Sequence, residues 1–219
     1  MIARIANRVW AWILDFIFPQ FCVNCGKFGQ LLCPSCFGQL EFHTSPIRLV
    51  LPERHLDSVW ACCVYKGAIK KLIKALKYQS IKDAAAVCGQ LLYYCSWPPQ
   101  DIECLTAVPI HPKRRRERGF NQAEIIAQTL AQLMNKPYLP LLQRLHHTPQ
   151  LAKLKHRQDR LKQLEHQIGI NPAFSHKTPL RVLIIDDVVT SGATLNECAK
   201  VLKQHGATCV DALCVAHGM

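Results

Sequence analysis

Acidic residues are scarce in this sequence of 219 residues. Asp and Glu number 15 against 27 Lys and Arg, which leaves a formal net charge of +12 at pH 7. An excess of this size favours negatively charged partners, either phosphorylated small molecules or nucleic acid, and composition does not choose between them. Charged residues amount to only 19% and hydrophobic residues to 49%, so the chain is a packed globular protein and not a disordered one.

The sequence also lacks a long apolar run. Residues 1–18 have apolar side chains at helical spacing, but this stretch is shorter than the roughly 20 residues that span a bilayer. Asp15 interrupts it and no small-residue cleavage site follows, which argues against a secretory signal. We therefore expect no transmembrane segment and a cytoplasmic protein. The amphipathic helix over residues 1–18 either packs on its own domain, which we favour, or docks on a membrane surface or a partner.

Cysteine, in contrast, is abundant. Two C-x-x-C pairs separated by seven residues supply Cys22, Cys25, Cys33 and Cys36. Paired thiolates at this spacing predict a tetrahedral four-cysteine Zn²⁺ site, and the alternative is a pair of redox motifs. Four thiolates leave no open coordination position, so we expect a structural role for the metal.

The other eight cysteines are scattered among apolar neighbours. A chain of this length is unlike a small secreted domain held by disulfides, which favours a reducing compartment. We expect these eight side chains to be buried small hydrophobic groups. They are Cys62, Cys63, Cys88, Cys95, Cys104, Cys198, Cys209 and Cys214.

A strand, an acid pair and a small-residue turn follow one another near the C-terminus. Residues 182–185 are apolar and β-favouring, as expected for a parallel strand buried on both faces. Asp186 and Asp187 come next, where an open α/β sheet places its ligands. The turn leads into a helical pattern over residues 195–205, and a helix N-terminus favours an anion. The turn residues are Thr190, Ser191, Gly192, Ala193 and Thr194, and Thr194 with Glu197 fits a capping box.

Two acids before a phosphate cradle suit a ligand that has both vicinal hydroxyls and a phosphate, such as a phosphorylated ribose. The stretch resembles the phosphoribosyl pyrophosphate (PRPP) motif of type I phosphoribosyltransferases. The resemblance implies that residues 190–194 hold the 5-phosphate and that Asp186 and Asp187 are catalytic residues that accept hydrogen bonds from the ribose hydroxyls. It also implies that PRPP binds with Mg²⁺. The alternative is an ordinary strand-turn-helix connection with acids at the helix start.

Two basic stretches precede this motif. Residues 66–82 contain six lysines and no acid, with apolar residues at helical spacing, which predicts an amphipathic helix with a lysine face. Residues 113–118 read K-R-R-R-E-R and lie between a predicted strand and a helix that begins at Asn121, where Glu124 completes a capping box. Either stretch is a solvated surface or a nucleic-acid patch, but arginines in a loop after a strand can also hold a pyrophosphate.

Nearly the whole chain resembles the ComF family. The shared features are the N-terminal helix, the four-cysteine knuckle, the lysine-rich helix, V-P-I-H-P-K-R-R-R-x-R-G-F-N-Q-A from residue 108 and D-D-V-V-T-S-G-A-T from residue 186. The resemblance implies a pyrophosphate loop over residues 108–118, with Pro109, His111, Arg115 and Arg116 as its site residues. It also implies that residues 144–164 form a hood that closes over the ligand and excludes water.

Alternating strands and helices predict an α/β fold with a mainly parallel sheet flanked by helices. The resemblance implies the type I phosphoribosyltransferase-like version over residues 53–219, preceded by the N-terminal helix and zinc knuckle in residues 1–52. The implied function is transfer or sensing of the phosphoribosyl group of Mg-bound PRPP, linked to competence and DNA uptake. Single-stranded DNA and DNA-uptake proteins are the further partners. The alternative is a non-catalytic nucleic-acid-binding partner of the DNA-uptake machinery that retains the fold.

Overall fold

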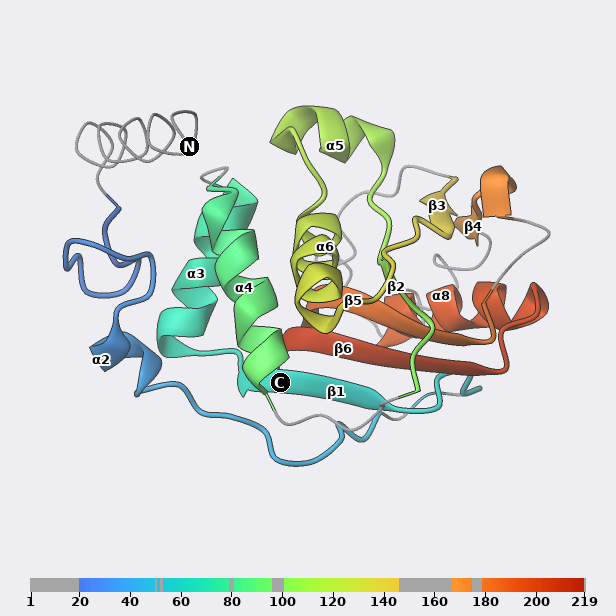
Figure 1. Cartoon of the computed structure of the whole chain (residues 1–219), viewed down its shortest axis with the longest axis horizontal. Coiled ribbons are helices and arrows are strands. Elements are labelled where there is room, and N and C mark those ends of the chain that lie inside the picture. Colours follow the sequence, from blue (N-terminus) through green and yellow to red (C-terminus); the bar gives the residue numbers. More distant parts are fainter. Residues whose placement is uncertain are drawn as a thin grey trace, which may run out of the picture.

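The centre of the protein is a four-stranded parallel sheet in the order β1-β6-β5-β2 (Figure 1). The computed structural model describes residues 20–49, 51, 53–78, 81–95, 101–145, 167–174 and 179–218. The strands are β1 (Val59–Val64), β2 (Cys104–Ala107), β5 (Arg181–Val189) and β6 (Cys209–His217). A separate antiparallel pair consists of β3 (Leu142–Arg144) and β4 (Ile168–Ile170).

Helices cover both faces of the sheet, as predicted. One face carries α3 (Gly67–Tyr78), α4 (Asp83–Tyr94) and α6 (Gln122–Met134), and the other carries α8 (Ala193–Gln204). Shorter helical elements are α2 (Pro34–Phe37), α5 (Pro112–Arg118) and the 3-10 turn η2 (Pro172–Phe174). Within the described ranges, none of the helices has the length and apolar character needed to cross a membrane.

Strand β5 lies inside the sheet, between β6 and β2. Its apolar side chains alternate between the two faces, since Leu183 and Ile185 pack with α3, α4 and α6 whereas Val182 and Ile184 pack with α8. All four are at most 1% exposed, which agrees with the predicted strand buried on both faces. The strand is longer than predicted, because its backbone continues to pair with β6 as far as Val189.

The four-cysteine region packs directly on the larger part of the molecule. Leu31 and Leu32 belong to the same hydrophobic cluster as the apolar side chains of α3 and α4. Lys71 of α3 also donates a hydrogen bond to the carbonyl oxygen of Asn24, at 3.0 Å. The proposed boundary at residue 52 therefore divides the chain, but it does not divide the core.

Neither predicted capping box forms. Asn121 is the N-cap residue of α6, but its side-chain amide donates to the carbonyl oxygen of Val108 at 3.0 Å and makes no cap hydrogen bond. This bond ties the start of α6 to the segment that follows β2. Helix α8 has Gly192 as its N-cap residue, so Thr194 lies inside the first turn and cannot cap it.

The cysteines outside the cluster follow the prediction in part. Five of the eight are free and buried, and Cys209 is partly exposed. Cys62 of β1 and Cys95 at the end of α4 are instead joined in a disulfide, with Cα atoms 5.9 Å apart. The fold brings them within bonding range across 33 residues of sequence, which spacing alone does not reveal.

Two predicted features fall outside the described residues. These are the helix over residues 1–18 and most of the hood segment, of which only Arg144 and Leu145 are described. Both remain predictions.

Replacing Leu183 by Ala should lower the free energy of unfolding by about 2–5 kcal/mol, because the change removes buried surface and leaves a cavity in the sheet. Urea denaturation followed by circular dichroism measures it. Leu180→Ala is the matched control, since Leu180 lies just before β5 and is 53% exposed. Its effect should stay within about 0.5 kcal/mol. An equal loss in both variants would contradict the central position of β5.

Candidate active site and metal centre

The acid pair lies near the carboxyl end of β5. Asp186 pairs with Cys214 of β6, so both acids are strand residues and do not follow the strand as predicted. Successive strand side chains point to opposite faces, and the two carboxylates therefore have different neighbours. The backbone N–H of Asp187 donates to Asp186 Oδ1 at 2.8 Å, which further fixes the Asp186 side chain.

Asp187 forms an ion pair with Lys77, a residue near the end of α3. Lys77 Nζ lies 2.8 Å from Asp187 Oδ1. Asp187 is 8% exposed, and a buried carboxylate is costly unless it is paired. Burial alone would lower the pKa of Lys77, but the Asp187 charge raises it above the ordinary value. The predicted lysine face is therefore wrong for Lys77, whereas Lys70 and Lys74 on the same helix are exposed.

The pKa of Asp186 lies well above the ordinary value for an aspartic acid. Burial, together with the neighbouring Asp187 charge, raises the pKa of Asp186 to about 7, while Lys77 and Arg144 act in the opposite direction. A carboxyl group that titrates near neutral pH, beside a specific charge partner, is typical of functional sites. Near neutral pH, a charge placed beside Asp186 by a ligand would therefore change its protonation state.

The turn after β5 leads into the N-terminus of α8. Thr190 is exposed, Ser191 is partly exposed, and Gly192 is the N-cap residue with φ +73°. A left-handed conformation of this kind favours glycine. A Cβ atom at this position would also overlap Leu49 Cδ1, so a larger residue would displace the end of the Leu49 side chain. The turn lies at the positive end of a 12-residue helix, where a phosphate is stabilised.

The basic segment before α6 is the short helix α5 and not the predicted loop. His111 is its N-cap residue, with Nδ1 accepting the backbone N–H two residues on at 3.1 Å, and Pro112 occupies the first turn. Both features start a helix locally. Arg115 pairs with Glu124 of α6 at 3.2 Å, and Arg116 is exposed. Of the four predicted loop residues, His111 therefore has a capping role here.

A cavity of about 230 Å³ opens beyond the end of β2. Pro109 and Arg115 line it, as a pyrophosphate loop would require, but His111 and Arg116 do not. Asn121 also lines the cavity; it is 6% exposed, and its Oδ1 has no hydrogen-bond partner among the described residues. Its Oδ1 is thus a buried acceptor beside the cavity whose hydrogen-bonding capacity is not met by the described residues.

Arg144 connects this cavity to the acid pair. It lines the cavity, and its Nη2 donates to Gln167 Oε1 at 2.9 Å. Arg144 and Asp186 are close enough for each charge to alter the pKa of the other. Arg144 is the first residue of the predicted hood, for which the sequence predicts no individual role. No local pattern marks it, because the β3–β4 pairing and the hydrogen bond with Gln167, 23 residues away in the chain, determine where it lies.

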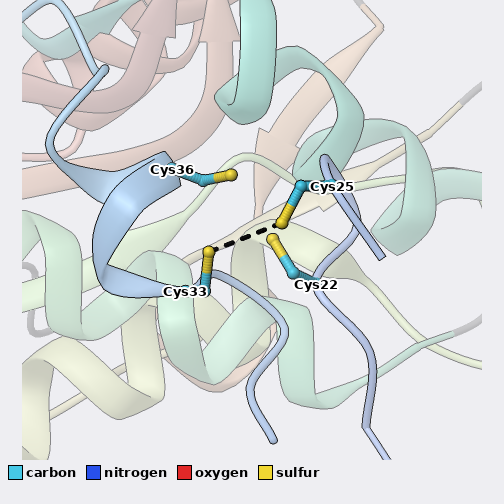
Figure 2. A group of neighbouring side chains, drawn as sticks. All are labelled: Cys22, Cys25, Cys33 and Cys36. Carbon is cyan, nitrogen blue, oxygen red and sulfur yellow. Dashed lines mark hydrogen bonds between the residues drawn. The ribbon is translucent and has the colours of Figure 1, made fainter. Parts of the chain in front are cut away.

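The predicted four-cysteine cluster forms. The sulfur atoms of Cys22, Cys25, Cys33 and Cys36 lie within 4.8 Å of one another and point toward a common centre (Figure 2). The Cys25 and Cys33 sulfurs are 3.6 Å apart. This is close to the separation of about 3.8 Å that tetrahedral coordination with zinc–sulfur bonds of about 2.3 Å requires. The cluster could therefore hold one metal ion.

Hydrogen bonds favour thiolate sulfur at Cys22 but not at every cysteine of the cluster. At Cys36 the Asn24 side chain lowers the pKa, but burial and hydrogen bonds with the other three cysteines raise it to about 12. Burial alone would raise the pKa of Cys22, but hydrogen bonds with the backbone of Cys33, Cys25 and Asn24 lower it to about 6. The Asn24 side-chain amide also lies 3.2 Å from the sulfur of Cys36, to which it donates. Donors of this kind support ligand sulfurs in metal sites.

Comparison with known proteins places the chain in a family. The phosphoribosyl transferase domain family matches residues 119–219. Competence protein ComFC of Streptococcus pneumoniae is 33% identical over 186 residues, which cover 83% of this chain and 78% of the relative. The chain belongs to the ComF family. Competence protein F of Haemophilus influenzae is 26% identical over 196 residues, covering 86% and 80% of the two chains. DNA utilization protein YhgH of Salmonella typhimurium is 28% identical over 197 residues, covering 84% and 83%.

This ComF-family protein has the type I phosphoribosyltransferase fold, with a parallel sheet flanked by helices and a four-cysteine cluster that fits a zinc knuckle. The matched segment contains β5, the acid pair, the turn and α8. Lys77 and the four cysteines lie before it. The partner of Asp187 thus comes from outside the segment that defines the domain family.

Replacing Lys77 by Met should move the pKa of Asp186 above about 7, because the lysine charge lowers it. An NMR titration that follows the side-chain carboxyl carbon of Asp186 measures the change. Lys74→Met is the matched control, since Lys74 lies on the same helix and is exposed. The interpretation fails if Lys77→Met leaves the titration unchanged or if the control shifts it equally.

Proposed function

We propose that this protein binds Mg-bound PRPP, or a closely related phosphoribosyl ligand, at the carboxyl end of β5 and transfers or senses its phosphoribosyl group. The observation that supports this most directly is the acid pair, with Asp187 buried and Asp186 half-buried, beside a helix N-terminus within a phosphoribosyl transferase domain. Asp186 and Asp187 accept hydrogen bonds from the ribose hydroxyls. Residues 190–194 hold the 5-phosphate with their hydroxyls and backbone N–H groups.

Catalysis at such a site depends on position and charge. In the reaction the bond between ribose C1 and the pyrophosphate oxygen breaks, positive charge develops on the ribose, and an acceptor nucleophile attacks C1. Asp186 and Asp187 orient the ribose and place negative charge beside the developing cation. Mg²⁺, when bound with PRPP, supplies positive charge to the leaving pyrophosphate.

The cavity beyond β2 is the proposed pyrophosphate side. Arg115 and Arg144 line it and carry positive charge, although Glu124, the ion-pair partner of Arg115, lines it too. Pro109 forms part of its wall. Guanidinium groups match phosphate oxygens in a bidentate geometry, which suits this role. His111 shapes the segment as the cap of α5, and Arg116 is exposed on the same helix.

The relatives suggest the process. Three of them are named for competence or DNA utilization, and we propose that this chain acts in DNA uptake or use in the cytoplasm. A second candidate function is a non-catalytic nucleic-acid-binding partner of DNA-uptake proteins. The net charge of +12 and the exposed lysines of α3 favour that candidate.

We also propose that the four-cysteine cluster holds one structural Zn²⁺. Its convergent sulfurs match a closed tetrahedral site, and the backbone hydrogen bonds at Cys22 and the Asn24 donor at Cys36 suit thiolate ligands.

Titration calorimetry should detect PRPP binding that needs Mg²⁺ and is lost in Asp186→Asn/Asp187→Asn. The affinity should rise as pH increases through about 7, because the ionised Asp186 is the stronger acceptor for ribose hydroxyls. Asp186→Asn alone should remove this pH dependence. Asp101→Asn, at a side chain that is 79% exposed, is the control and should leave binding unchanged. A pH-independent affinity in the wild type would contradict the assigned role of Asp186.

Thr190→Val/Thr194→Val tests the phosphate cradle, because it removes two hydroxyls at nearly constant side-chain volume. We expect PRPP affinity to fall roughly tenfold or more, as for lost hydrogen bonds to a charged group. Gly192→Val would be a poorer test, since its side chain would displace Leu49. Unchanged affinity in the threonine variant would show that the phosphate binds elsewhere.

Elemental analysis of the purified protein should give one zinc per chain. Cys22→Ser/Cys36→Ser should lose the metal, whereas Cys88→Ser, at a buried cysteine outside the cluster, should keep it. Chelation should also unfold the knuckle, because metal binding and folding are coupled at such sites. A wild-type protein without zinc, or a double variant that retains it, would refute the assignment.

A further inference from the structure

The disulfide between Cys62 and Cys95 joins a buried residue to an accessible one. Cys62 lies in β1 and is 2% exposed, whereas Cys95 is the C-cap residue of α4 and is partly exposed. Disulfides are rare in a reducing compartment, and those that form there are usually transient and either catalytic or redox-sensing. Because the sequence favours a reducing compartment, we expect this bond to be more than a permanent support.

The two ends of the bond differ in the access that they give to a reagent. Thiol–disulfide exchange starts when a thiolate attacks a sulfur atom that it can approach, and the partly exposed Cys95 is the side from which it can start. Cys62 is shielded by the core, with its sulfur 4.0 Å from the carbonyl oxygen of Leu91 on α4. A mixed disulfide can therefore form on Cys95 and be resolved by Cys62.

The end of α4 is compatible with an open bond as well as with a closed one. Leu91 and Leu92 hold the last turns of the helix in the core, at 5% and 0% exposure. At Cys95 the backbone is already extended, and its N–H donates to the Leu91 carbonyl at 3.1 Å. Breaking the sulfur–sulfur bond therefore releases the end of the helix and leaves the core packing in place.

A third sulfur lies close to the bond. Cys63 Sγ is 3.6 Å from Cys62 Sγ. Cys63 is fully buried, and burial raises the pKa of its thiol to about 12. Because the thiolate is the attacking form, this thiol stays protonated and does not exchange with the bond. Cys95 therefore pairs with Cys62 and not with Cys63.

We propose that Cys62 and Cys95 form a reversible redox switch that ties the end of α4 to β1. When a low-molecular-weight disulfide is the oxidant, the Cys95 thiolate attacks one of its sulfurs and displaces the other as a thiolate. The Cys62 thiolate then attacks the Cys95 sulfur of the mixed disulfide and displaces the second thiolate. Two cysteine thiols are oxidised, the reagent is reduced to two thiols, and the two cysteine protons pass to them. An excess of the reduced thiol drives the same steps backwards.

The switch acts on the helical layer that carries Lys77. The bond closes a loop across a sequence separation of 33 residues, and this loop contains α3 and α4. A closed loop has fewer unfolded conformations, so oxidation stabilises the folded layer relative to the unfolded chain. Lys77 of α3 is the ion-pair partner of Asp187. The stability of the layer that holds this counter-charge thus follows the redox state, whether or not PRPP binds.

Thermal unfolding in glutathione buffers, followed by circular dichroism, tests the proposal. The wild type should melt roughly 5 °C or more higher in oxidised than in reduced glutathione. Returning the oxidised protein to reduced glutathione should restore the lower melting temperature. Cys95→Ser should melt at the same temperature in both buffers. Hydrogen exchange at the Cys95 amide should become faster on reduction, while exchange in β5 should stay unchanged.

Cys63→Ser is the matched control for the pairing. It removes the neighbouring thiol and should keep the redox-dependent shift, whereas Cys62→Ser should lose it. Each variant is compared with itself in the two buffers, so a general loss of stability from a buried serine does not affect the result. The metal content is measured in both buffers and should be equal, which separates this bond from the four cysteines of the knuckle.

Three results would overturn the proposal. The first is a wild-type melting temperature that is the same in oxidised and reduced glutathione. The second is a shift that persists in Cys95→Ser, since another pair of thiols would then be responsible. The third is a shift that persists in Cys62→Ser and is lost in Cys63→Ser, which would make Cys63 the partner of Cys95.

Discussion

Two adjacent carboxylates in a buried central strand set the constraint on which the rest of the site depends. β5 has a neighbouring strand on each side and helices on both faces, so water cannot fully solvate Asp186 and Asp187. Lys77 compensates one charge directly. The charge of Asp186 is compensated less directly, and burial raises its pKa to about 7. The charge of this acid pair is therefore only partly compensated by the protein.

Helix α3 supplies the lysine that compensates the charge of Asp187, and the same helix packs against the four-cysteine knuckle. Its apolar face is fully buried in the core, with Ile69, Leu72, Ile73 and Leu76 at 0–1% exposure. The same helix places Lys77 at the acid pair and Lys71 against the knuckle. A knuckle of this size cannot build a sufficient core by itself, so it shares the core beneath α3 and is held together by its cysteines. The knuckle and the acid pair are consequently joined through one rigid element.

The sequence alone predicted those features of the fold and the site whose physical signal is local. The apolar run at residues 182–185 predicted a strand buried on both faces, and the doubled C-x-x-C spacing predicted the converged sulfurs. It was insufficient where distant segments meet. Lys77 and Asp187 are 110 residues apart, and in the amphipathic pattern Lys77 looks like any exposed lysine of α3. Asn121 is the N-cap residue of α6 as predicted, but its capping box is absent for a related reason, since a hydrogen bond from its Nδ2 to the Val108 carbonyl orients the side chain away from the cap geometry.

The position of Lys77 in the chain also affects where the functional unit of the protein begins. The domain family covers residues 119–219, and a fragment of that extent would leave the buried Asp187 without Lys77. Removing one partner of a buried ion pair lowers the stability of the folded protein more than replacing both partners with apolar residues. A Mg-bound ligand that approaches Asp187 meets Lys77 at the same carboxylate. The ammonium group has three donors, so Lys77 can bond Asp187 and a ligand phosphate oxygen together, and the ion pair need not break for the ligand to bind. We infer that α3 contributes Lys77 to the proposed ligand site as well as apolar side chains to the core.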